Sequence, residues 1–237
     1  MRKSIFFYLI IVSATLLVAK DLPGLWLANV EITAVNEIHS SATNADILTP
    51  VKYPFNLQLL LHMDASGSTK LLKEVFVMQT KDGNTSDRNI EQVLITDTSK
   101  IKDFDGIIKR GDNKLVGIRL TTPSFDFDTS KSFWPLTGSI SSNKGTIITG
   151  TNIFHSKNHP TNPFRHQFHP EHKEGFDLNR TFNIRITNEN IKPTQIDKRL
   201  TGIYTETIKG LHKSALKVSG TVDMVLVSSI SILNPSK

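Results

Sequence analysis

The chain has 237 residues, with 28 Lys and Arg against 22 Asp and Glu, a formal charge of +6, and no Cys. The absence of Cys excludes disulfides, Cys-ligated zinc or iron–sulfur sites and a thiol nucleophile. The hydrophobic fraction of 38% is sufficient for a buried core and excludes an intrinsically disordered chain. The length suits one large domain or two small ones.

The N-terminus has the three parts of a secretory signal peptide. Arg2 and Lys3 supply a basic start, residues 5–12 are apolar, and Ala19 is a small residue before the next charge. We predict a signal peptide over residues 1–19, with cleavage after Ala14 as the alternative. An uncleaved anchor is disfavoured, because the apolar run of about 15 residues is shorter than the ~20 needed to span a bilayer.

Cleavage changes what the charge implies. Loss of Arg2 and Lys3 leaves 26 basic against 22 acidic residues, a charge of +4. This excess is too small and too scattered to predict nucleic-acid binding. We expect an exported protein, periplasmic or secreted, with no transmembrane span after cleavage and with stability that comes from core burial.

Alternating apolar residues predict strands in the first part of the mature chain. Residues 26–34 alternate between apolar and polar side chains, as a half-buried strand requires. The polar, unpatterned residues 36–52 are predicted to form a loop. Residues 54–79 are predicted to form a β-hairpin around a Gly-containing turn. A helix over 70–78 is the alternative, since its apolar residues also fit helical spacing, but the preceding turn and the β-branched residues favour a strand.

Shorter strands are predicted in the middle of the chain. Residues 91–96 and 114–120 are rich in β-branched and aliphatic side chains. Residues 136–140 and 146–153 are predicted to pair as a second hairpin through a turn that contains Asn and Gly. The Pro- and His-rich residues 154–176 are predicted to form an excursion loop.

The last part of the chain contains the longest predicted hairpin. After a strand at 182–186, residues 202–209 are expected to pair with residues 216–226. The final strand is predicted to run as far as Ile232. A strand of that length is unusual, so a bend is expected at Gly220.

No stretch predicts a long amphipathic helix. The pattern of about nine or ten strands joined by hairpins is typical of an all-β protein, either an antiparallel barrel or a sandwich. Both architectures alternate in the same way, so both remain open. We predict that residues 20–237 form a single β-rich domain.

The excursion loop is the strongest candidate for chemistry. Five of the eight His lie between residues 155 and 172. Imidazole is the commonest protein ligand for zinc and other transition metals, so a metal site is one hypothesis, with His166, His169, His172 and Glu171 as ligands. Pro170 excludes a continuous helix through these His, so the loop must fold back to bring them together. The alternatives are a structured loop that packs over one end of the sheet, and a polar ligand-binding or catalytic loop.

Other catalytic signatures are absent from the sequence. There is no GxSxG, Walker, GxGxxG, EF-hand or HExxH motif. Asp126 and Asp128 lie two residues apart, which suits paired-carboxylate or calcium chemistry but is more typical of the outer face of an edge strand.

Two resemblances to known families follow from short motifs. Gly24-Leu25-Trp26 resembles the GxW motif of lipocalins and implies a barrel that carries a small apolar ligand, although residues 218–236 hold no Arg or Lys to pack on the Trp. More of the chain is similar to an uncharacterised β-rich domain that recurs in exported proteins of environmental bacteria. That second resemblance implies no activity, and its motifs are GLW at 24–26, HMDASG at 62–67, KLL at 70–72, VLITD at 93–97, FDFD at 125–128, NPFRHQFHPEH at 162–172 and GIYTETIKGL at 202–211.

These observations favour an exported, non-catalytic β-domain with a binding or scaffolding role and no cofactor. One alternative is a metal-binding protein or metal-dependent enzyme that uses the His of residues 155–172, with zinc or another transition metal. The other is a lipocalin-like carrier. The partner stays unidentified at this stage.

Overall fold

The computed structural model describes most of the chain after the predicted signal peptide. The described residues are 20–36, 47–79, 92–103, 118–122, 125, 131–157, 176–211 and 214–235. Within these ranges the chain forms eleven β-strands and two short 3-10 turns, η1 (Thr98–Asp103) and η2 (Pro193–Gln195), and contains no α-helix. The all-β prediction is confirmed. No helix of the described part is long and apolar enough to cross a membrane.

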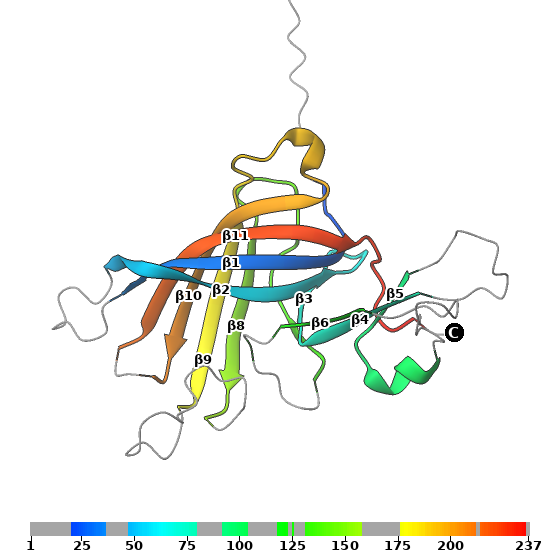
Figure 1. The fold of residues 1–237 in the computed structure, drawn as a ribbon, viewed down its shortest axis with the longest axis horizontal. Coiled ribbons are helices and arrows are strands. Elements are labelled where there is room, and N and C mark those ends of the chain that lie inside the picture. Colours follow the sequence, from blue (N-terminus) through cyan, green and yellow to red (C-terminus); the bar gives the residue numbers. More distant parts are fainter. Residues whose placement is uncertain are drawn as a thin grey trace, which may run out of the picture.

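Eight strands form one antiparallel sheet with the order β7-β3-β2-β1-β11-β10-β9-β8 (Figure 1). The strands are β1 (Gly24–Asn36), β2 (Leu48–Met63), β3 (Thr69–Leu72), β7 (Phe133–Pro135), β8 (Ile147–His155), β9 (Leu178–Ile186), β10 (Arg199–Lys209) and β11 (Leu216–Ser228). The first described strand therefore pairs with the last, from Leu25 opposite Ser228 to Val35 opposite Val218.

A second, smaller sheet has the order β5-β4-β6 and lies at the right of Figure 1. Its strands are β4 (Glu74–Gln79), β5 (Gln92–Ile95) and β6 (Ile118–Thr121). It packs on the β1–β3 part of the large sheet through an apolar cluster from both sheets that includes Leu25, Leu60, Leu72, Val75 and Leu94.

The main core lies on the other face of the large sheet. Along β1, Trp26, Val30 and Ile32 are fully buried whereas Asn29 and Glu31 are exposed, as expected for side chains that alternate between faces. Inward residues of β1, β2, β3 and β8–β11 belong to one apolar cluster, so the sheet curves around its own core. Each fully buried large side chain contributes about 1.5–3 kcal/mol.

The two ends of the large sheet meet at a single point. Thr137, just after β7, and Thr149 of β8 exchange two backbone hydrogen bonds of 2.9 and 2.8 Å. In the described residues this one bridge is isolated and does not continue as a ladder, so the structure has two antiparallel sheets and no closed barrel.

The predicted loop over 36–52 is wrong at both ends. Asn36 belongs to β1, and β2 begins at Leu48, so that Thr49 pairs with Val35. The side chains of this part of β2 are largely exposed. Among the described residues its other edge is unpaired, since β3 joins β2 only from Leu60 onward. An unpaired edge tolerates Pro50, which has no N–H to donate to a ladder.

The predicted hairpin over 54–79 is correct only as far as Leu72. Beyond it, Lys73 donates its N–H to the Ser132 carbonyl and accepts a hydrogen bond from the Thr122 N–H, and the chain crosses into the small sheet as β4. A strand rather than a helix over 70–78 is confirmed. The predicted hairpin of 136–140 with 146–153 is reduced to the single Thr137–Thr149 bridge, and the Ile140 carbonyl accepts the Leu22 N–H instead.

The predicted C-terminal hairpin is confirmed as β10 and β11, which pair from Arg199 opposite Val225 to Ile208 opposite Leu216. The final strand ends at Ser228 and does not reach Ile232. The irregularity expected at Gly220 lies in the partner strand, where the register shifts between Ile32 and Ala34.

A candidate binding groove on the outer face

The predicted metal ligands His166, His169, His172 and Glu171 lie outside the described residues, as do Asp126 and Asp128. The metal hypothesis therefore stays a prediction. Among the residues that the structure does describe, no group of three or more His, Asp or Glu could hold a metal ion.

His155, at the end of β8, is the one member of the His-rich segment with a described position. It is fully buried, and its ring lies 6.0 Å from the ring of Phe125. It pairs with Leu178 of β9, so residues 154 and 155 belong to β8 and not to the excursion predicted over 154–176.

A buried ion pair lies close to this position. Arg180 of β9 forms a two-point ion pair with Glu206 of β10, and Tyr204 donates a hydrogen bond of 2.9 Å to the same carboxylate. The guanidinium lies 4.0 Å from the centre of the Phe125 ring. Both charged side chains are almost fully buried, at 4% and 2% exposed. Because both charged side chains are this deeply buried, we assign the pair to the core.

The electrostatics of the ion pair are consistent with a structural role. Burial disfavours the charged form of Arg180, but the charge and hydrogen bonds of Glu206 outweigh it, and the net pKa shift is upward. Burial, with the Glu206 charge, raises the pKa of Tyr204 well above its usual value. Arg180 stays charged and Tyr204 stays neutral, so neither group exchanges a proton near neutral pH.

The outer face of the large sheet offers a more accessible candidate site. A groove of about 640 Å³ crosses β2, β1, β11 and β10 and is bordered by residues 187–191, which follow β9. We call this the outer groove. It lies on the polar side of the strands, the side opposite the main core.

Two cross-strand rows of side chains build the floor of the outer groove. The register of the four strands sets each row, because residues opposite each other on one face lie about 5 Å apart. One row is Asn29, Asp223 and Thr201, and Gln58 lies opposite Asn29 outside the lining. The next is Asn56, Glu31, Thr221 and Ile203.

Hydrogen bonds hold several of these side chains in place. Gln58 donates to the Asn29 amide oxygen over 3.1 Å. Arg199 donates two hydrogen bonds, of 2.8 and 2.7 Å, to the carboxylate of Asp223, and these bonds raise the pKa of Arg199. A two-point guanidinium–carboxylate pair has a fixed planar geometry, so it presents an ordered edge to a ligand.

The wall formed by residues 187–191 is also fixed. Asn188 adopts a positive φ of 52° and donates its amide to the Ser142 carbonyl over 3.0 Å. Thr201 donates its hydroxyl to the Glu189 carbonyl over 3.0 Å. These contacts tie the wall both to β10 and to the turn at 142–145.

Glycine keeps the backbone of neighbouring strands close under the outer groove. A Cβ on Gly202 would lie 2.3 Å from the Arg185 carbonyl oxygen, and one on Gly220 would lie 2.0 Å from the Glu31 carbonyl oxygen. Both distances are too short for any other residue without a shift of the backbone. The shape of this part of the sheet therefore depends on these two glycines.

The charged side chains of the outer groove are mostly acidic. Its lining includes three carboxylates, from Glu31, Glu189 and Asp223, against the single guanidinium of Arg199, and none of the lining residues is aromatic. A shallower pocket of about 300 Å³ adjoins it beyond Glu189 and is lined by Lys144 and Arg185. Glu189 lines both pockets, so the acidic outer groove and the basic pocket meet at this residue.

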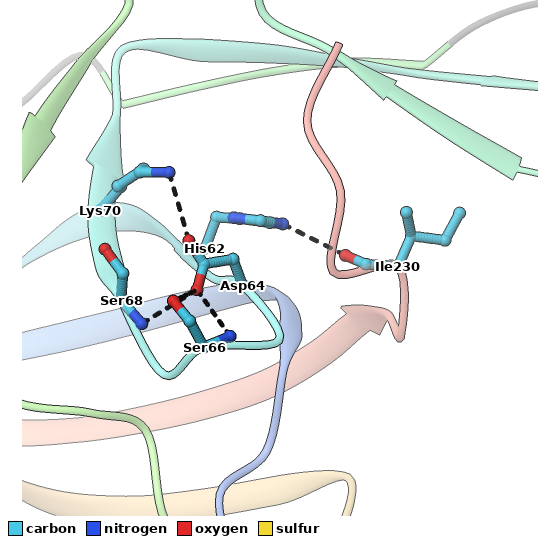
Figure 2. A network of polar contacts seen from close by, with 6 residues as sticks. All are labelled: His62, Asp64, Ser66, Ser68, Lys70 and Ile230. Carbon is cyan, nitrogen blue, oxygen red and sulfur yellow. Dashed lines mark hydrogen bonds and ion pairs between the residues drawn. The ribbon is translucent and has the colours of Figure 1, made fainter. Parts of the chain in front are cut away.

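A second polar network lies at the turn between β2 and β3, at the site where β11 ends (Figure 2). The carboxylate of Asp64 accepts hydrogen bonds from the backbone and hydroxyl of Ser66 and from the Ser68 N–H, and Lys70 approaches it at 3.5 Å. These partners, Ser66 foremost, lower the pKa of Asp64. The network closes the turn.

His62 connects this turn to the C-terminal segment. Its Nε2 donates to the Ile230 carbonyl over 3.2 Å, as Figure 2 shows, while its buried Nδ1 has no hydrogen-bond partner among the described residues. Burial lowers the pKa of His62 below 6.5. The ring is therefore neutral in the folded protein at neutral pH.

Neither the outer groove nor the buried ion pair is among the sites expected from the sequence. The polar positions Asn29 and Glu31 were expected on a solvent face, but the residues that lie opposite them come from about 190 positions later in the chain. No family model matches the chain, and no curated protein matches it.

Proposed function

We propose that the protein is an exported, non-catalytic β-domain that binds a polar ligand in the outer groove. The observation that carries this proposal is the groove itself: ordered amide, hydroxyl and carboxylate side chains from four strands line one concave surface. A surface built only for solvation does not require a two-point ion pair in its lining or a wall that hydrogen bonds hold beside it.

Export is the second part of the proposal. It is supported by the basic start, apolar run and Ala19 of residues 1–19. Mass spectrometry of the protein recovered outside the cytoplasm tests it: we expect a mature N-terminus at Lys20. Recovery of the intact chain from the cytoplasm would contradict export.

For the architecture, we propose a sandwich-like fold rather than a barrel. The small sheet packs face to face on the β1–β3 part of the large sheet, and the ends of the large sheet share one bridge only. The main core is filled by apolar and aromatic side chains, including Trp26, Phe182 and Tyr204. This packing supports a surface site over the internal cavity that a lipocalin-like carrier needs.

A charge placed in the outer groove tests the binding role. Thr221 lies at the centre of the second row, so T221R should fill the groove and abolish binding. V227R is the matched control, because Val227 is exposed on the same strand six residues away, outside the groove lining. Binding of a panel of soluble oligosaccharides is measured by calorimetry. Equal binding by both variants would overturn the assignment of the groove.

A further inference from the structure

We propose that the ligand of the outer groove is a short saccharide that carries a free amine, with its ammonium group over Glu31. This inference rests on the proposed function and names the ligand class. It follows from the hydrogen-bonding groups of the groove and from the distribution of its charges.

The side chains of the lining match a ligand rich in hydroxyl groups. Asn29, Asn56 and Asn190 each offer both donors and an acceptor, and Thr187, Thr201 and Thr221 offer hydroxyls. Such groups bind polyols by pairs of hydrogen bonds along the sheet. The groove spans four strands, roughly 14 Å between the outer two, which matches a trisaccharide.

The charges select the amine. Asp223 is already neutralised by Arg199, and Glu189 lines the same pocket as the cations Lys144 and Arg185. Glu31 has no ion-pair partner in the described part of the chain, and its row neighbours Asn56 and Thr221 are neutral. An uncompensated carboxylate beside neutral donors and acceptors favours a cationic group on the ligand and disfavours a carboxylate there.

The neighbouring pocket sets the direction of the ligand. Arg185 lies opposite Ile203 on β9, three strands away from Glu31, and Lys144 lines the same pocket as Arg185. A cationic group near this end is repelled. The ammonium therefore lies at the β1 end, and the neutral part of the saccharide extends toward β9.

Two chemically matched trisaccharides test the inference: the β-1,4-linked glucosamine trimer and its tri-N-acetylated form, which differ only in their amines. By calorimetry at low salt we expect the free-amine trimer to bind about fivefold more tightly than the acetylated one. E31Q should remove this preference without changing the affinity for the acetylated trimer. R185Q is the control, and it should not weaken binding of the free-amine trimer.

The outcomes separate the ligand class from the site. Tighter binding of the acetylated trimer, or of a galacturonate trimer, that T221R abolishes would overturn the amine and leave the groove as the binding site. Trilysine that binds as tightly as the glucosamine trimer would overturn the saccharide. If no probe binds in a way that T221R abolishes, both the inference and the proposed function fail.

Discussion

Arg180 and Glu206 lie on adjacent strands of the large sheet and form a two-point ion pair inside its core. Tyr204 and the ring of Phe125 complete the surroundings of the pair. Two opposite charges in an apolar interior are stable only together, because either one alone would be buried without compensation.

We therefore expect E206Q to be strongly destabilising. The substitution leaves the Arg180 guanidinium buried opposite a neutral amide, at a cost of about 3–5 kcal/mol in the free energy of unfolding. Denaturant unfolding monitored by Trp fluorescence measures it. The double variant R180M/E206L should recover most of the loss; if it is no more stable than E206Q, the pair has a role beyond charge compensation.

His62 should make the stability of the protein depend on pH. Because burial lowers its pKa in the folded state, the unfolded chain binds more protons once the pH falls below about 6.5. The contribution is fully present above the unfolded-state pKa and is lost as the pH falls toward the folded-state value. Melting temperatures at pH 7.5 and 5.0 should differ more for the wild-type protein than for H62Q.

The amide of Asn234 should hold the C-terminal segment on the small sheet. Its oxygen accepts hydrogen bonds from the Thr96 and Asp97 N–H groups over 2.8 and 3.0 Å, and its nitrogen donates to the Thr96 hydroxyl. N234G retains the positive φ of 52° without strain but loses these contacts. We expect a loss of about 1–3 kcal/mol and faster proteolysis after Ser228. Unchanged proteolysis would show that other contacts fix the segment.

Gly220 should tolerate no side chain. In G220A the new methyl group would lie 2.0 Å from the Glu31 carbonyl oxygen, so β1 and β11 must separate, at a cost of about 3 kcal/mol. G145A is the comparison: Gly145 has a φ of +87° but open space around it, so only backbone strain of about 1 kcal/mol is expected. Chemical denaturation ranks the two, and a smaller loss for G220A would contradict the close approach.

Local patterning accounts for the strands that were predicted correctly. Period-two alternation identified residues 26–34 and 216–226, because each of these strands has one buried and one exposed face. It failed at residues 48–52, where β2 pairs on one side only and its side chains are largely exposed. Pairing over a long sequence distance, such as Leu25 with Ser228, is not a property of any local pattern.

Alternation in the sequence places both residues of the buried ion pair on inward faces, although charged residues are rarely buried. Leu178, Arg180, Phe182 and Ile184 alternate in register, so Arg180 belongs to the buried face of β9. A predicted strand over 182–186 begins too late because an Arg is an improbable core residue. Glu206 likewise belongs to the buried face of its strand, since it lies between the inward Tyr204 and Ile208.

The position of β11 between β1 and β10 has a consequence for when the protein can fold. Trp26 and its neighbours acquire their central partner only after some 200 further residues have been synthesised. A chain of this topology has high contact order and folds slowly, with its large sheet incomplete until the last strand arrives. Such a delay keeps the polypeptide unfolded for longer. An unfolded chain is the form that must pass through a membrane if the protein crosses it before folding.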